Sequence, residues 1–87
     1  MTQTIDDIRH LLATLLRVDA DVIGPDSLLR ELPNMDSAAV LEAVVLIEDH
    51  FRIEFSDSVV LRLERVQDLA EAVDDLRFGQ PTSQYVH

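Results

Sequence analysis

The stretch DSAAVLEAVVLIEDHF, residues 36–51, decides the fold of this chain. Its apolar residues recur at the spacing of an α-helix. Val40, Val44, Ile47 and Phe51 stand at positions i, i+4, i+7 and i+11, which places them on one side of a helix. The pattern therefore predicts a helix over about 37–51 with these four residues as its core stripe.

The same helix carries a second stripe that mixes apolar and acidic residues. An exposed leucine or valine is ordinary on a protein surface when it stands alone. Here the apolar residues lie among three acids, and protein interfaces combine apolar anchors with a charged rim. We therefore predict a docking surface for protein partners, made of Ala38, Leu41, Glu42, Val45, Glu48 and Asp49.

Asp36 and Ser37 stand at the start of this helix. Both residue types are favoured helix caps, so a plain capping role is the simplest interpretation of the pair. Neither has Glu or Gln at the third helical position, where Ala39 or Val40 falls, so the pair forms no capping box. A serine hydroxyl there lies beside the free N–H groups and positive dipole end of the helix, where a phosphate ester is well placed. We interpret Ser37 as an attachment point.

The stretch 32–37, Leu-Pro-Asn-Met-Asp-Ser, resembles the phosphopantetheine site of acyl carrier proteins, and the resemblance extends over about residues 4 to 77. It includes the second helix and the segment after it, with Glu42, Glu48, Asp49, Phe51, Ile53 and Phe55. It implies that Ser37 carries 4′-phosphopantetheine, donated by coenzyme A, and that acyl groups ride on its terminal thiol as thioesters. It also implies that Asp36 orients the junction between helix and arm.

The resemblance implies a carrier without catalytic activity of its own. Its partners would be a phosphopantetheinyl transferase and the acyl-activating ligase, synthase or acyltransferase enzymes of a fatty-acid, polyketide or other dedicated acyl pathway. Glu42, Glu48 and Asp49 would meet basic docking surfaces on those enzymes. Small residues of the second helix, Ala38, Ala39 and Ala43, would leave room for an acyl chain between helices, and the alternative is that these alanines simply favour the helix.

Two positions depart from the family pattern. Asn34 replaces a glycine, and asparagine tolerates turn conformations nearly as well. Ala38 replaces a leucine directly after the serine, which removes an apolar side chain beside the arm. We therefore expect a specialised carrier serving its own small pathway. The Leu-Pro-x-Met-Asp-Ser variant resembles carriers that accompany dedicated acyl-activating or polysaccharide-export gene sets.

A second Asp-Ser pair, Asp26-Ser27, matches the family's literal Asp-Ser-Leu string more closely. However, Pro33 follows within six residues and opposes a continuing helix, and Gly24-Pro25 before the pair is turn chemistry. We predict that Ser27 is structural.

The remaining sequence predicts an all-α fold, a small antiparallel bundle of three main helices plus one short helix. Thr4 precedes a helical run that ends near Arg17, with Asp6 and Asp7 in its first turn. A long loop over 18–35 follows, with one short helical turn at 27–31. Ser56 caps a short helix over about 57–63, and a last helix covers 66–76 with Val66, Leu69, Val73 and Leu76 toward the core. We expect one domain, residues 1–78, and a flexible tail, 79–87.

Composition excludes several function classes. The 87 residues include 17 acidic and seven basic residues, and the formal net charge is −10. Nucleic acid and anionic membranes are therefore poor partners, whereas basic protein surfaces are good ones. The chain has no cysteine, so any thiol chemistry requires an added group. Without a signal peptide pattern or an apolar run long enough for a membrane span, we expect a cytoplasmic monomer.

Independent catalysis and metal binding are not supported by the sequence. His10, His50 and His87 lack metal-site spacing, and the consecutive residues of Glu48-Asp49-His50 point in different directions on a helix. Two other functions remain open. A standalone peptidyl or aminoacyl carrier would share the fold, although Asp36 and the acidic second helix weigh against it. An unmodified acidic helical interaction module would require Ser37 to be a plain cap.

Overall fold

The computed structural model describes residues 2–78, and the predicted tail lies outside this range. Four α-helices account for most of the described chain: α1 (Thr2–Leu16), α2 (Ser37–Phe51), α3 (Asp57–Arg62) and α4 (Val66–Phe78). Two short 3₁₀ helices, η1 (Ala20–Val22) and η2 (Leu29–Glu31), interrupt the loop between α1 and α2. The predicted all-α fold is confirmed.

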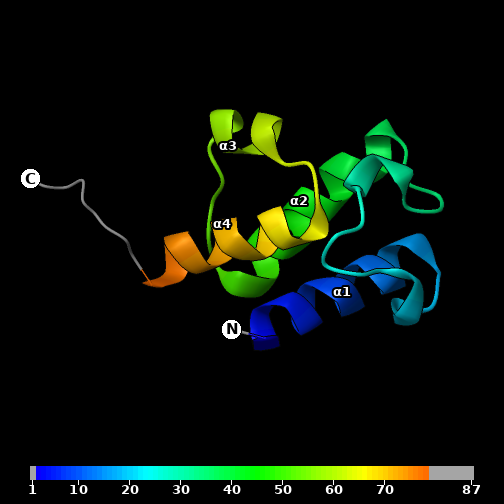
Figure 1. Cartoon of the computed structure of the whole chain (residues 1–87). Helices are drawn as coiled ribbons and strands as arrows, with labels where there is room; N and C mark the ends of the chain where they lie inside the picture. Colours follow the sequence, from blue (N-terminus) through cyan, green and yellow to red (C-terminus); the bar gives the residue numbers. More distant parts are fainter. Residues whose placement is uncertain (1, 79–87) are drawn as a thin grey trace, which may run out of the picture.

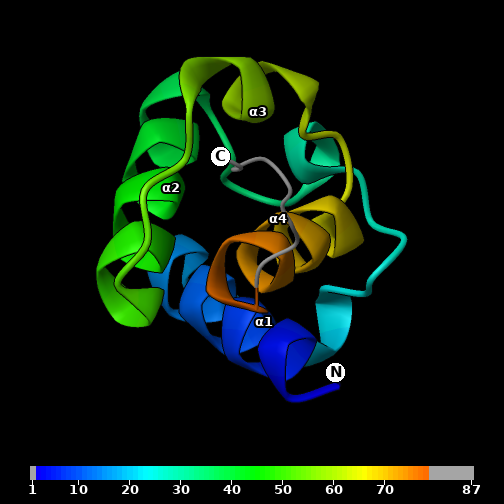
Figure 2. The ribbon, with the colours of Figure 1, turned by 90° about the vertical axis from the view of Figure 1, so that its left-hand side faces the viewer.

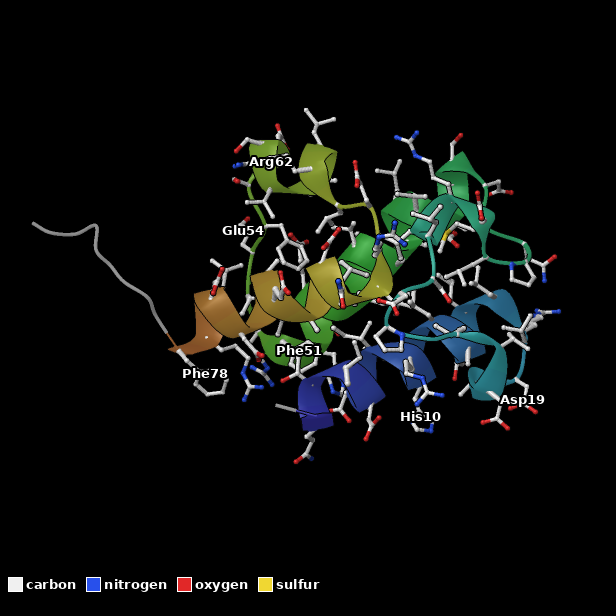
Figure 3. The ribbon with its side chains drawn as sticks, viewed as in Figure 1. His10, Asp19, Phe51, Glu54, Arg62 and Phe78 are labelled. Carbon is white, nitrogen blue, oxygen red and sulfur yellow. The ribbon has the colours of Figure 1, made fainter. Side chains whose placement is uncertain are left out.

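The three long helices form the body of the bundle. α1 contacts both α2 and α4 and runs antiparallel to them, while the short α3 lies on the other side of the bundle from α1 (Figure 1). Phe51 and Phe78 lie at the end where α2 and α4 finish, and Asp19 lies at the opposite end (Figure 3). None of the helices in residues 2–78 is long and apolar enough to cross a membrane.

The core lies between the three long helices. Ile8 and Leu12 of α1, Ile47 of α2, and Val66 and Val73 of α4 are each at most 1% exposed. Burying one such side chain contributes about 1.5–3 kcal/mol, so these residues account for much of the stability of a small domain.

The side of α2 that packs deepest in the core differs from the predicted core stripe by a rotation of about one residue position around the helix. The buried residues of α2 are Ala39, Ala43 and Ile47, whereas Val40, Val44 and Phe51 are only half-buried. The prediction was correct for Ile47 and wrong about the depth of the other three. Helical periodicity locates the apolar side of a helix, but small residues occupy the line of closest packing because their side chains let neighbouring elements approach.

The first and last helices, α1 and α4, show further differences from the prediction. Leu76 is 49% exposed and lies in a surface hollow beside Val59 and Leu63, so it is not a core residue. α1 begins at Thr2, before the predicted start, and its first turn therefore contains neither Asp6 nor Asp7. Thr4 is buried and does not precede the helix. Its Oγ1 donates a 2.8 Å hydrogen bond to Asp74 Oδ1, which joins α1 to α4.

The loop between α1 and α2 is held by hydrogen bonds as well as by buried side chains. Arg9 of α1 donates from Nε to the carbonyl oxygen of Ile23 at 2.6 Å and from Nη2 to that of Ala20 at 2.9 Å. The Ser27 hydroxyl accepts from the Gly24 amide at 3.0 Å, and the Ser27 carbonyl accepts from the Val66 amide, also at 3.0 Å. Ser27 therefore ties the loop to the start of α4, in agreement with its predicted structural role.

The predicted short helices are also present. η2 lies within the predicted turn at 27–31, and the Leu29 amide donates to the Glu64 carbonyl at 2.8 Å, which anchors η2 to the segment between α3 and α4. Ser56 caps α3 as predicted, because its hydroxyl accepts from the Val59 amide at 3.3 Å.

Candidate functional site at the start of α2

Asp36 is the residue that caps α2. Its backbone is extended, and its Oδ1 accepts a 2.8 Å hydrogen bond from the Ala39 amide. Its carbonyl oxygen accepts from the Val40 amide at 3.0 Å. Ser37 is the first residue of the helix and is exposed. The capping role therefore belongs to Asp36, and the exposed Ser37 in the first turn of α2 is left without a capping role.

The turn before Asp36 fixes the direction from which the chain enters α2. Asn34 has a φ of 66°, in the left-handed region where glycine and asparagine are tolerated best. Its side-chain Nδ2 donates a 2.7 Å hydrogen bond to the Leu16 carbonyl at the end of α1. Asparagine thus adopts the turn, as predicted, and also joins this turn to α1, which glycine has no side chain to do.

The predicted docking surface of α2, which mixes apolar and acidic residues and is called the mixed face below, is largely exposed. Leu41 is 65% exposed and Val45 is 61% exposed, and together with Leu15, Glu42 and Leu46 they line a shallow hollow between α1 and α2. A second hollow, further along the helix, is lined by Val45, Glu48, Asp49, Arg52, Ile53 and Glu54. Ala38, Glu42 and Asp49 are exposed as well.

Glu48 differs from the other acids of this face because it is half-buried. Its Oε2 accepts a 2.8 Å hydrogen bond from the amide of Phe55, a residue that is only 7% exposed. The sequence pattern grouped Glu48 with Glu42 and Asp49. It gave no sign of this contact, which depends on the path of the chain after α2.

An apolar cavity of about 180 Å³ is lined by Met35 and Val40, which precede and follow Ser37 in the sequence. In Figure 2, α3 lies at the top of the bundle between α2 and the η2 segment, and residues of all three elements line the cavity. A slightly smaller engineered cavity, of about 150 Å³, remains dry and binds benzene, so this volume suits a small apolar group. The lining residues are Leu29, Arg30, Met35, Val40, Ala43, Val44, Val60, Leu61, Leu63 and Leu69.

Sequence reasoning located this cavity only in part. Of the alanines expected to leave room between helices, Ala43 lines the cavity, Ala39 is buried without lining it, and Ala38 is exposed. The contribution of α3 and of Arg30 was missed. The available signal was the apolar run Val59-Val60-Leu61, which is more apolar than a six-residue surface helix requires.

The histidines of the described chain lie apart from this site. His10 is on the outer side of α1, with its Nδ1 2.8 Å from the Asp6 carbonyl oxygen (Figure 3). His50 Nε2 lies 3.8 Å from Asp7 Oδ2, while Glu48 contacts Phe55, so the Glu48-Asp49-His50 run does not converge on one point. Within residues 2–78, no group of three His, Asp or Glu side chains is placed to hold a metal ion.

Comparison with known proteins identifies the family. The family model described as "Phosphopantetheine attachment site" matches residues 6–73. The acyl carrier protein of Campylobacter jejuni subsp. doylei is 31% identical over 74 residues, which are 85% of this chain and 96% of that protein. The acyl carrier protein of Streptomyces coelicolor is 41% identical over 69 residues, which are 78% of this chain and 75% of that protein. These matches confirm the resemblance: the chain belongs to the acyl carrier protein family, and is a non-catalytic carrier whose prosthetic group is 4′-phosphopantetheine.

Proposed function

We propose that Ser37 is the attachment residue and that the chain holds acyl groups as thioesters on the arm for the enzymes of a dedicated acyl pathway. The observation that carries this proposal is the division of roles at the start of α2. Because Asp36 caps the helix, the exposed hydroxyl of Ser37 is available for a phosphodiester. The amides and positive dipole end of α2 favour the negative charge of that group.

The surroundings of Ser37 fit a long, flexible arm that carries an acyl group. Met35 and Val40, on either side of Ser37 in the sequence, both line the apolar cavity. An arm attached at Ser37 therefore starts near an opening into which a small apolar chain fits. In this proposal Asp36 holds the junction in place through its bond to Ala39, and Asn34 holds the preceding turn against α1.

Partner enzymes would dock on the mixed face of α2. In this proposal Leu41 and Val45 supply the apolar contact, and Glu42 and Asp49 supply exposed negative charge. The small side chain of Ala38 leaves the surface beside Ser37 accessible to a partner. Glu48 lies on the same face, although one of its carboxylate oxygens is bonded to the Phe55 amide. The partners in this proposal are a phosphopantetheinyl transferase and acyl-activating ligases, synthases or acyltransferases with basic surfaces.

Attachment is tested by incubating the apo protein with coenzyme A and a phosphopantetheinyl transferase, followed by intact mass measurement. We expect the mass of one phosphopantetheine to be added to the unaltered protein and to Ser27→Ala, but not to Ser37→Ala. Ser37 is exposed, so Ser37→Ala should remain folded by circular dichroism. Modification of Ser37→Ala would overturn the assignment.

A further inference from the structure

Arg30 is the one charged residue among the side chains that line the apolar cavity. It belongs to η2 and is exposed at the edge of the cavity beside Leu61, a leucine that is itself 83% exposed. The backbone of η2 is held in place, because the Leu29 amide donates to the Glu64 carbonyl at 2.8 Å and the Glu31 amide donates to the Leu28 carbonyl at 3.0 Å. The base of the Arg30 side chain is therefore fixed at the rim.

The guanidinium of Arg30 makes no hydrogen bond or ion pair within residues 2–78. Arg17 and Arg52 also have no side-chain partner among the described residues, whereas four other arginines do. Arg9 binds two loop carbonyls, Arg65 Nη1 donates to the Asp26 carbonyl at 2.7 Å, and Arg77 lies 5.4 Å from the centre of the Phe51 ring. Of the arginines without a side-chain partner in residues 2–78, only Arg30 lines the apolar cavity.

An arginine at the edge of an apolar wall has two physical uses. Its aliphatic stem can cover apolar surface while its head stays in water. Its planar guanidinium can also bind a carboxylate or phosphate through two parallel hydrogen bonds, which are charge-assisted and therefore strong. The second use matters here because the field of this acidic chain repels anions, so an anionic group near the cavity requires a local positive charge.

We propose that Arg30 binds an oxyanion of the loaded arm at the rim of the cavity, and that the preferred cargo is a short acyl group that ends in a carboxylate. This inference rests on the proposed attachment at Ser37. The carboxylate of the cargo and the phosphodiester of the arm offer the same chemistry to a guanidinium, so the experiment must separate these two sources.

The experiment compares four forms of the protein: apo, holo, succinyl-loaded and pentanoyl-loaded. The last two are prepared from the corresponding coenzyme A thioesters with a phosphopantetheinyl transferase, and they differ mainly in the terminal carboxylate. Each form is made for the unaltered chain, for Arg30→Gln and Arg30→Lys, and for Arg62→Gln. Arg62 is an exposed arginine of α3 that does not line the cavity, so its substitution makes the same charge change without altering the cavity lining.

Urea unfolding of each form gives its unfolding equilibrium constant. We expect Arg30→Gln to raise this constant about tenfold for the succinyl form, as the loss of one charge-assisted pair implies, and Arg62→Gln to change it by less than about twofold. Arg30→Gln should change the constant of the pentanoyl form, which has no terminal carboxylate, by less than about twofold. Arg30→Lys should affect the succinyl form less than Arg30→Gln does, because lysine keeps the charge but lacks the planar guanidinium that makes two parallel hydrogen bonds.

The remaining outcomes are also decisive. If Arg30→Gln weakens the holo form as much as the succinyl form, the oxyanion is the phosphodiester and the preference for an acidic cargo is wrong. If Arg30→Gln changes all four forms equally, or none of them, Arg30 only covers apolar surface and the inference is overturned. Failure of the attachment proposal is visible earlier and separately, since no loaded form would then show added mass on Ser37.

Discussion

The Oε2 atom of Glu48 lies 2.8 Å from the amide nitrogen of Phe55, so an acid of the proposed docking face also closes the turn after α2. The carbonyl oxygen of Glu48 accepts hydrogen bonds from the amides of Arg52 and Ile53 as well. Glu48 thus holds the chain where it leaves α2 and places Phe55 in the core. A substitution at Glu48 therefore tests the fold as well as docking, and the acids of α2 must be examined separately.

We predict that Glu48→Ala destabilises the apo protein by about 1.5–3 kcal/mol, because it leaves the Phe55 amide without its charged acceptor. Asp49→Ala is the matched control. Asp49 is exposed and adjacent, and its substitution should change the free energy of unfolding by about 0.5 kcal/mol or less. Urea unfolding measures both values. Equal losses would show that the Glu48 bond adds nothing to stability.

Docking is best tested by charge reversal at exposed acids alone. We predict that Glu42→Lys with Asp49→Lys lowers kcat/KM for phosphopantetheinylation by about tenfold or more, because complementary charge mainly governs encounter. Glu71→Lys with Asp75→Lys makes the same change in net charge at exposed positions of α4 and should cost less than about twofold. Added salt should reduce the difference between the two variants. A similar loss in both would mean that bulk charge, and no particular face, attracts the transferase.

The Thr4 and Asp74 side chains join α1 to α4 through a 2.8 Å hydrogen bond between residues 70 positions apart. Thr4 is only 4% exposed, so Thr4→Val keeps the shape of the side chain and removes its hydroxyl from a buried position. We predict a loss of about 1–2 kcal/mol for Thr4→Val. A double-mutant cycle with Asp74→Ala should give a coupling of about 0.5 kcal/mol or more. Additive losses would show that the two groups do not interact in solution.

The rotated core stripe of α2 predicts an order of stability losses. Ile47 is 0% exposed, so Ile47→Ala should cost about 2–5 kcal/mol. Phe51 is half-buried, so Phe51→Ala should lower the free energy of unfolding by less for each atom removed than Ile47→Ala does. Leu41→Ala should lower it by about 0.5 kcal/mol or less, because Leu41 is 65% exposed. Denaturant titrations of the three variants measure this order. A loss for Leu41→Ala as large as that for Ile47→Ala would reverse the assignment of the two faces.

The sequence alone determined the features that depend on neighbouring residues. The predicted bounds of the second helix, 37–51, agree with α2 (Ser37–Phe51), and Ser56 caps α3 as expected. Periodicity and capping act over one or two helical turns, so the residues responsible are close together in the chain. The Leu-Pro-Asn-Met-Asp-Ser motif, on which the proposed attachment at Ser37 rests, is local for the same reason.

Tertiary structure alone decided which side of each helix is deepest and which polar groups meet. Ala39 and Ala43 are buried because of how closely neighbouring elements pack on α2, and the buried hydroxyl of Thr4 is satisfied by Asp74 of α4, which accepts its hydrogen bond. Arg30 stands at the cavity rim because η2 is bonded to the Glu64 carbonyl. Each of these depends on contacts between segments far apart in the sequence, whose distances are set by the packing of the whole core and not by any local pattern.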